Sequence, residues 1–204
     1  MAVKPYRLAF ADVSRLADDA LAGRWLSPEL FATAPHGSRR QVWLAGRILL
    51  SILLDKGPLP LLAIGPNGKP SHPQLPHFNI SNSATGVAVL LGEREVGCDM
   101  ELLRPRPRFM AVARHSFSAG LVEWLEALPV EEQLHAFWRL WTAHEAVLKQ
   151  QGGTVWQISS LDLPLDTLCP AGRWLTHLAV NGALIACCGR EPFPAEFTPE
   201  LVLL

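Results

Sequence analysis

This sequence has few charged residues and almost no net charge. Charged side chains make up 18% of the 204 residues, and the formal net charge at pH 7 is −1. A near-neutral chain has no overall field that attracts nucleic acid or a membrane surface, so we expect neither partner. No apolar run approaches the roughly 18 residues that cross a bilayer. No continuous apolar stretch follows Met1–Leu8 either, so we expect no signal peptide and a cytoplasmic location.

Cysteine is scarce, and its spacing points to no metal site. The four cysteines, Cys98, Cys169, Cys187 and Cys188, form no C-x-x-C pair and no cysteine–histidine spacing typical of zinc. Buried free thiols in a reducing compartment are the favoured interpretation. A glycine-rich phosphate loop of the Walker type is also missing, which argues against an unrelated magnesium-dependent phosphotransferase. Any function that depends on charge must therefore come from local clusters.

Hydrophobic residues, at 49% of the chain, are plentiful enough for a substantial core, and their spacing predicts the elements around it. Helical periodicity predicts helices over Arg39–Leu54 and Ala136–Gln151, the second closed by Gly152-Gly153. Alternating apolar residues and turn signals predict strands at His77–Ser81, Gly86–Leu91, Val96–Glu101, Trp174–Val180 and Ala183–Cys188. Helices packed on antiparallel strands indicate an α+β fold.

The order of these elements is similar in the two halves of the chain. Each half offers one long amphipathic helix and a hairpin, although residue identity between the halves is poor. We therefore hypothesise a pseudodimer of two similar lobes, residues 1–103 and residues 104–204. The stretch Gly57–His77 contains six prolines and is predicted to be mostly loop.

Asp99 and Glu101 are the first candidates for chemistry. Residues two apart on a strand point to the same face, so both carboxylates would lie side by side while Cys98 and Met100 face the core. Paired carboxylates repel each other and favour a cation, and Mg²⁺ often takes one or two carboxylates together with substrate phosphates. A solvated strand end is the alternative interpretation.

Glu145 lies on the apolar stripe of the second long helix, which runs through Trp138, Trp141 and Leu148. An unpaired buried charge costs several kcal/mol or more. Either this face meets a cleft or Glu145 has a partner, and Lys149, four residues on, is within reach. The alternative is an ordinary surface Glu–Lys pair.

Two further polar sets are ambiguous by themselves. Arginine clusters suit phosphate because the guanidinium fork matches its oxygens, but the basic residues here could equally be solvated charges; they are Arg39, Arg40, Arg47 and Lys69. The polar end of the strand at 77–83 could donate hydrogen bonds to a phosphate or simply form a turn; its residues are Ser81, Asn82 and Ser83.

Taken together, these segments resemble the 4′-phosphopantetheinyl transferase superfamily. The matching motifs are F-N-I-S-N-S at 78–83, V-G-C-D-M-E at 96–101 and F-W-R-L-W-T-A-H-E-A-V-L-K-Q-Q-G-G at 137–153, with G-K-P at 68–70 and an arginine-bearing helix upstream. Their order and spacing resemble the monomeric, two-lobed, Sfp-like type, and the short chain is most similar to the AcpT-type bacterial enzymes. The resemblance covers roughly Arg39–Leu163.

The resemblance implies a pseudodimer with coenzyme A in the cleft between lobes, and transfer of phosphopantetheine to a carrier-protein serine with release of 3′,5′-ADP. It implies that Asp99, Glu101 and Glu145 are ligands of Mg²⁺, that Glu145 is the candidate base and that Lys149 holds the phosphates. The implied coenzyme A-binding residues are Arg39, Arg40, Arg47, Lys69, Ser81, Asn82, His144 and Lys149.

Two positions depart from the family pattern. Asn82 stands where the family usually has histidine, and His144 stands where it usually has lysine. Both changes remove positive charge, so we expect weaker coenzyme A binding or a slower, pH-sensitive enzyme. A catalytically impaired coenzyme A-binding or regulatory protein is the alternative function.

The implied macromolecular partner is an acyl or peptidyl carrier protein, which the family resemblance implies is acidic near its modified serine. The segment Arg104-Pro105-Arg106-Pro107-Arg108 is a candidate dock for that surface. A stiff connector between lobes would also explain the alternating prolines.

Overall fold

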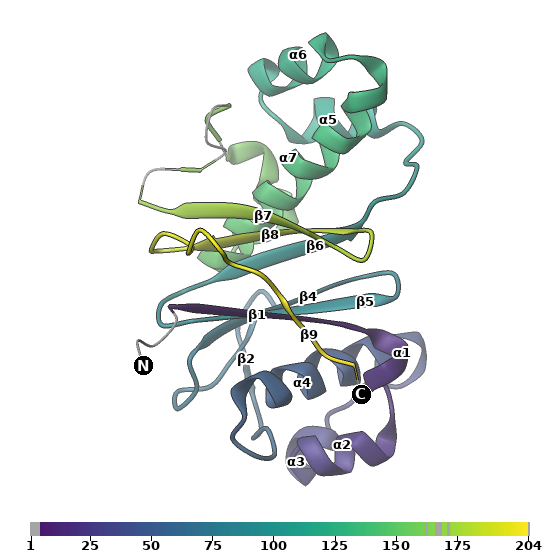
Figure 1. The fold of residues 1–204 in the computed structure, drawn as a ribbon, viewed down its shortest axis with the longest axis vertical. Coiled ribbons are helices and arrows are strands. Elements are labelled where there is room, and N and C mark those ends of the chain that lie inside the picture. The colour runs from purple at the N-terminus through teal and green to yellow at the C-terminus, as the bar shows by residue number, and fades with distance from the viewer. Residues whose placement is uncertain (1–4, 162, 166–168, 171, 204) are drawn as a thin grey trace.

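The computed structural model describes residues 5–161, 163–165, 169–170 and 172–203. Two small sheets lie one above the other, with four helices outside one sheet and three outside the other (Figure 1). The helices are α1 (Val13–Leu16), α2 (Asp19–Trp25), α3 (Pro28–Phe31), α4 (Arg40–Leu54), α5 (Phe109–Ser116), α6 (Ala119–Ala127) and α7 (Val130–Gln151). The predicted α+β class is confirmed.

The first sheet has the strand order β4-β5-β1-β9, formed by β4 (His77–Ser83), β5 (Gly86–Gly92), β1 (Tyr6–Asp12) and β9 (Glu200–Leu201). Its strands are antiparallel except for β9, which is parallel to β1. Helix α4 packs on this sheet through aliphatic residues such as Leu44 and Ile48, which confirms the predicted first helix. We call this sheet with α1–α4 the α4 half. The proline-rich stretch contains only the short pair β2 (Ala63–Ile64) and β3 (Pro70–Ser71).

The second sheet has the order β6-β8-β7, formed by β6 (Gly97–Leu102), β8 (Ala183–Gly189) and β7 (Trp174–Val180). Asn181 and Gly182 join β7 to β8 with φ values of 47° and 75°, the positive values that a tight hairpin turn of this sequence adopts. We call this sheet with α5–α7 the α7 half. Helix α7 begins at Val130, earlier than the predicted start at Ala136. Its first turns are largely exposed and carry little apolar periodicity, so the sequence pattern does not reveal them.

The two sheets exchange segments across the boundary predicted after residue 103. Strand β6 precedes that boundary yet pairs with β8, and the C-terminal strand β9 returns to β1. Each sheet therefore contains segments from both sides of residue 103, and a boundary between two lobes at that position stays a prediction. Among the described residues, no helix is long and apolar enough to cross a membrane.

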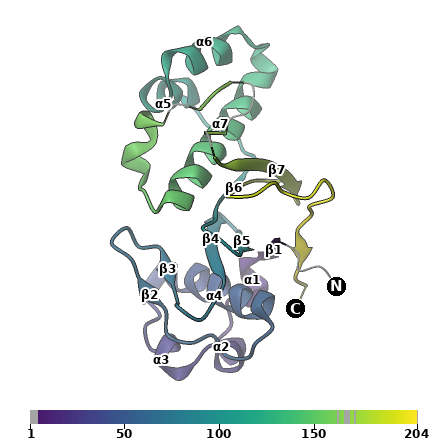
Figure 2. The ribbon, with the colours of Figure 1, turned by 90° about the vertical axis from the view of Figure 1, so that its left-hand side faces the viewer.

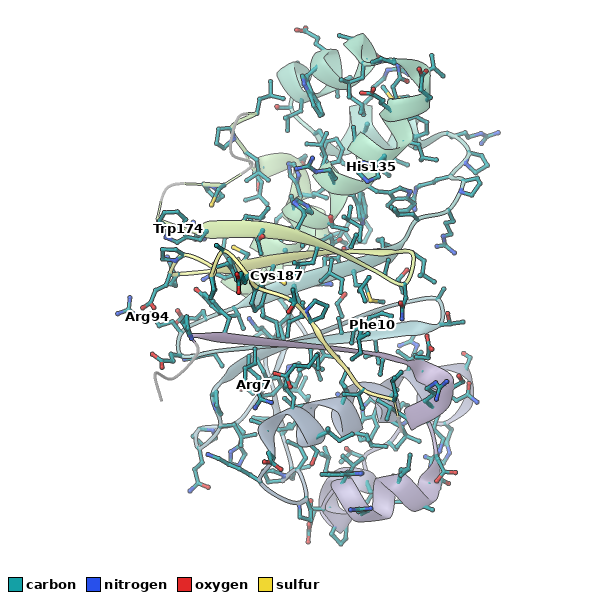
Figure 3. All side chains as sticks on the ribbon, viewed as in Figure 1. Arg7, Phe10, Arg94, His135, Trp174 and Cys187 are labelled. Atoms are coloured by element: carbon teal, nitrogen blue, oxygen red, sulfur yellow. The ribbon has the colours of Figure 1, made fainter. Side chains whose placement is uncertain are left out.

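An apolar layer fills the space between the sheets. It includes Phe10 of β1 and Cys187 of β8, both labelled in Figure 3, together with Leu90, Cys98 and Met100. Cys98 and Met100 thus face the core, as strand alternation predicts. The opposite face of β6 carries Asp99 and Glu101, and it is this face that α7 covers.

Candidate active site

The two sheets meet at a polar seam between β4 and β6. Three β4 side chains accept hydrogen bonds from alternate backbone N–H groups of β6, in the pairs Asn79–Cys98 (2.8 Å), Ser81–Met100 (3.1 Å) and Ser83–Leu102 (3.3 Å). Side chains two apart share one face of a strand, so N-x-S-x-S supplies acceptors at the same period as the donors. The seam fixes β6 beside β4 and sets Asp99 and Glu101 next to the serines.

Helix α7 reaches this seam because residue 97 is glycine. A Cβ at Gly97 would clash with the backbone of Ala146 and of Gln150, so a larger residue would push the helix away from β6. The close approach brings Lys149 Nζ to 2.6 Å from Asp99 Oδ1 and 3.2 Å from Ser81 Oγ. The glycine of the G-C-D-M-E motif therefore determines how near the helix comes to the strand carboxylates.

Three carboxylates gather on this face. Asp99 is buried, and its Oδ2 has no hydrogen-bond partner in the part of the chain that the structure describes. Glu101 is half-buried and accepts a hydrogen bond of 2.5 Å from Ser83 Oγ. Glu145 is half-buried as well, and among the described residues its carboxylate makes no hydrogen bond or salt bridge. These side chains come from two elements that lie far apart in the sequence, β6 and α7.

The electrostatics of the group follow from burial and mutual repulsion. Burial raises the pKa of Glu145, the charges of Asp99 and Glu101 raise it further, and Lys149 opposes the rise. Burial also raises the pKa of Glu101, against the hydrogen bond from Ser83. Burial alone would lower the pKa of Lys149, but the charge and hydrogen bond of Asp99 outweigh it, and the net shift is upward. The site therefore favours an additional cation.

The donor chemistry fits a divalent cation such as Mg²⁺. Carboxylate oxygens are the ligands that Mg²⁺ prefers. Among the described residues, Asp99 Oδ2 and the carboxylate of Glu145 have no hydrogen-bond partner, so both are available to bind a metal ion. Across the described ranges, no group of three or more His, Cys, Asp or Glu residues is close enough to enclose a metal. A partial protein set is compatible with Mg²⁺, which commonly completes its shell with phosphate oxygens and water.

Lys149 does not form the surface pair with Glu145 that helical spacing allowed. Its ammonium points instead to Asp99 of β6, with N···O 2.6 Å. Asp99 is almost fully buried, so this ion pair is largely withdrawn from solvent. The alternative of an ordinary solvated Glu–Lys pair on the helix is therefore not what the structure shows.

Lys69 is bound to the C-terminal end of α7. Its Nζ donates to the carbonyl oxygens of Val96 (2.8 Å) and Lys149 (2.6 Å), and Asn67 Nδ2 donates to the carbonyl of Gly152 at 2.7 Å. A cation and an amide donor satisfy carbonyls that a helix C-terminus leaves unpaired. Figure 2 shows the β2–β3 turn reaching this end of α7. Burial lowers the pKa of Lys69.

A small pocket opens beside Lys149. Its volume is about 160 Å³, and Lys69, Lys149, Gly152 and Gly153 contribute to its lining. The pocket thus lies between the β2–β3 turn of one half and the end of α7 from the other. It is a concave space next to a cation, which suits part of an anionic ligand.

The arginines of the first long helix lie apart from this group. Arg39 is exposed. Arg40 forms a 2.9 Å salt bridge with Asp19, and the Arg47 guanidinium stacks 4.1 Å from the ring of Trp43. Burial lowers the pKa of Arg47 to about 10, and its Nε finds no hydrogen-bond partner among the residues described. Within the described residues, no contact joins these arginines to the Asp99 group.

Two predicted binding residues point away from the seam. Asn82 is exposed, because it alternates with the buried Ser81 and Ser83 along β4. His144 is fully buried in the interior of the α7 half, with its ring 4.7 Å from Phe117 and its Nδ1 2.7 Å from the carbonyl of Leu140. Burial lowers its pKa to about 4. His144 thus lies in the interior of the α7 half rather than at the seam, and its contact with coenzyme A stays a prediction.

The arginine-proline segment is held against α7. The Arg106 guanidinium lies 5.3 to 5.8 Å from the ring centroids of Phe137, Trp138 and Trp141. The indole Nε1 of Trp138 also donates to the carbonyl of Arg104 at 3.3 Å. Arg106 is therefore a packed anchor, whereas Arg104 and Arg108 are exposed beside Glu101's end of β6.

Several residues that build the site have no predicted role in building it. Asn79 and Gly97 lie within the matching motifs without an assigned role, and Ser83 is predicted only as a phosphate donor or a turn former. A usable signal was present, because N-x-S-x-S and C-x-M-x-L share a period of two. Nothing local in the sequence predicts that Asn67 and Lys69 contact the end of α7, which is distant along the chain.

Comparison with known proteins identifies the family of this chain. The family model of the 4′-phosphopantetheinyl transferase superfamily matches residues 95–181, which contain β6 and α7. The chain belongs to this superfamily, and it is a transferase.

Its relatives include proteins that match nearly its whole length. It is 40% identical over 200 residues to the 4′-phosphopantetheinyl transferase AcpT of Salmonella typhimurium, covering 97% of each chain. It is 40% identical over 191 residues to AcpT of Escherichia coli K12, covering 92% of each. The 4′-phosphopantetheinyl transferase Sfp of Bacillus subtilis is 35% identical over 102 residues, 49% of this chain and 42% of Sfp.

Proposed function

We propose that this protein transfers phosphopantetheine from coenzyme A to a serine of an acyl or peptidyl carrier protein. The serine oxygen forms a bond to the phosphorus that carries the pantetheine arm, the pyrophosphate P–O bond breaks, and 3′,5′-ADP leaves. The observation that carries this proposal is the convergence of Asp99, Glu101, Glu145 and Lys149 at one seam. The names of the AcpT relatives support the same chemistry.

Glu145 is the base that takes the serine proton. Its carboxylate is uncommitted among the described side chains, and its raised pKa makes it a stronger proton acceptor than a solvated glutamate. General bases work best when their pKa approaches the operating pH. Lys149 supplies positive charge beside the reacting phosphates, from a position fixed by the approach of α7 to Gly97.

Asp99, Glu101 and Glu145 would hold Mg²⁺ between the protein and the pyrophosphate. The bound ion would neutralise the charge that develops as the phosphoryl bond breaks. The protein's own contribution is to orient the strand carboxylates, Asp99 by its ion pair with Lys149 and Glu101 by the hydrogen bond from Ser83.

Coenzyme A would occupy the joint between the two halves, which we propose form the two lobes of a monomeric, cytoplasmic pseudodimer. The pocket beside Lys149 and Lys69 lies at this joint. Among the arginines, Arg47 is best prepared for a phosphate, because its buried Nε lacks a partner, and Arg39 and Arg40 would add charge nearby. Ser81, Asn82 and His144 were expected to contact coenzyme A, but Asn82 and His144 point elsewhere.

The carrier protein would dock beside the end of β6. Arg104 and Arg108 are exposed there, and Arg106 anchors the segment on aromatic rings rather than leaving it a free linker. An acidic carrier surface would be complementary to these two exposed charges.

The test is to incubate the purified protein with coenzyme A, Mg²⁺ and apo carrier proteins from the same genome, and to weigh each carrier by mass spectrometry. We expect one carrier to gain the phosphopantetheine arm and EDTA to prevent the gain. No gain on any carrier, with coenzyme A still bound, would instead support the impaired coenzyme A-binding protein.

A further inference from the structure

The hydrogen-bond roles of two seam serines follow from their partners. Ser81 Oγ is contacted by two groups that only donate, the N–H of Met100 at 3.1 Å and the ammonium of Lys149 at 3.2 Å. A serine hydroxyl has one proton to give. That proton must therefore point to the remaining partner, Asp99 Oδ1, at 3.0 Å.

Ser83 repeats this arrangement one step along the seam. Its Oγ accepts from the N–H of Leu102 at 3.3 Å, so its proton points to Glu101 Oε2 at 2.5 Å. Asn79, the third member of the seam, also accepts a β6 N–H, but its side chain bonds to no carboxylate of the described residues. Ser81 and Ser83 thus each make a hydrogen bond to a carboxylate in addition to the hydrogen bond that joins β4 to β6.

We propose that Ser83 and Ser81 are positioning residues, which use one fixed hydroxyl each to orient Glu101 and Asp99 for metal binding. This inference rests on the proposed function, in which these carboxylates are metal ligands. Each serine hydroxyl accepts a hydrogen bond from a β6 N–H and donates one to the neighbouring β6 carboxylate. The same hydroxyl therefore fixes both the register of the strand and the direction of the carboxylate. Partners that orient ligating carboxylates commonly affect metal affinity strongly.

Ser83 gives the cleaner test, because Ser81 also contacts Lys149. Mn²⁺ is added to protein containing coenzyme A, and free Mn²⁺ is followed by EPR. We expect Ser83→Ala to weaken Mn²⁺ binding by about 10- to 100-fold, and Ser83→Thr, which keeps the hydroxyl, to stay within about threefold of the parent.

Ser51→Ala is the matched control. Ser51 is a buried serine of α4 whose hydroxyl donates to the carbonyl of Gly57 at 2.9 Å, away from the carboxylates. It should lose stability without losing Mn²⁺ affinity. If Ser83→Ala does not fold, Ser83→Cys replaces it, since a thiol of similar size donates only weakly, and a several-fold loss of affinity is expected.

Unchanged Mn²⁺ affinity in Ser83→Ala, or in Ser83→Cys if the alanine variant is unfolded, would overturn the positioning role. Because the titration needs no carrier protein, it is independent of transfer. A parent protein that transfers the arm while the Ser83 variants bind Mn²⁺ normally contradicts this inference alone. A parent protein that binds Mn²⁺ through Ser83-dependent carboxylates but transfers nothing contradicts the proposed function alone.

Discussion

The two long helices each cover one sheet, but they bury different kinds of side chain. Helix α4 covers the first sheet almost entirely with aliphatic side chains, and Ser51 is its one fully buried polar residue. Helix α7 covers the second sheet while burying Thr142, His144 and Gln150 and half-burying Glu145. Its Lys149 donates to Asp99 of β6 and, across the seam, to Ser81 of β4.

The difference shows where charge can be used chemically. The cations of α4 are engaged within their own half, Arg40 by Asp19 and Arg47 by Trp43. The ionic groups of α7 face the joint, where Asp99 from β6 and Lys69 from the other half meet them. A helix that only covers its sheet contributes stability, whereas one that also faces a second unit brings partners from distant segments together.

Glu145→Gln should have the largest effect. The substitution keeps the size of the side chain but removes its basicity, so we expect the rate of arm transfer to fall by about 10²- to 10⁴-fold. Mass spectrometry of the carrier protein over time measures the rate. Glu132→Gln changes an exposed glutamate in the first turn of the same helix and should leave it unchanged. Equal rates in both variants would remove Glu145 from the mechanism.

His144 should make the α7 half sensitive to acid. Burial lowers its pKa from 6.5 to about 4, so between these values the unfolded chain binds the proton and the native protein does not. The free energy of unfolding is therefore retained above pH 6.5 and lost as the pH falls. Between pH 7 and pH 5 the loss from this residue should be about 2 kcal/mol.

Urea unfolding of His144→Leu at both pH values measures this term. The variant should lose about 2 kcal/mol less than the parent between pH 7 and pH 5. His36→Leu, at an exposed position of the α4 half, serves as the control. A parallel pH dependence in the parent and His144→Leu would mean that this histidine does not titrate as its burial implies.

The same contrast explains what the sequence could predict. Both long helices, the β7–β8 hairpin and the shared face of Asp99 and Glu101 follow from local periodicity, and all are present. The partner of Lys149 does not, because helical spacing considers one helix only and Asp99 lies on another element.

Residues that are adjacent in a motif need not point to the same site. Asn82 follows Ser81, and His144 precedes Glu145, yet each points away from the seam. Alternation along a strand places Asn82 and Ser81 on opposite faces, and successive residues of a helix, such as His144 and Glu145, point in different directions. The helices α1–α3, α5 and α6 are not predicted, since brief helices carry too little periodic signal. Strand β1 is as long as β4 and β5, but it is buried along nearly its whole length, so its apolar residues do not alternate with polar ones.

Lys69→Met should weaken the contact between the β2–β3 turn and the end of α7. The change leaves the carbonyls of Val96 and Lys149 without their shared donor, and we expect the free energy of unfolding to fall by roughly 1–2 kcal/mol. Lys56→Met, at an exposed lysine just after α4, is the matched control and should change little. An increase in the KM for coenzyme A with no loss of stability would show that Lys69 binds phosphate rather than capping α7.

Charge reversal on the arginine-proline segment should have the smallest effect. Arg104→Glu and Arg108→Glu place negative charge at two exposed positions, and each should raise the KM for an acidic carrier by roughly two- to fivefold. Arg106 is left in place, because its packing on three aromatic rings would confuse loss of charge with loss of structure. The KM for coenzyme A should not change.

Arg24→Glu reverses a charge at an exposed position on α2 in the α4 half, and it should leave the carrier KM unaltered. The KM of the parent should also rise with salt more steeply than that of Arg104→Glu/Arg108→Glu, because salt screens the attraction between these arginines and the carrier, which the variant lacks. If all three substitutions alter the carrier KM equally, the effect belongs to net charge. The segment would then be a structural connector anchored by Arg106, and the carrier would dock elsewhere.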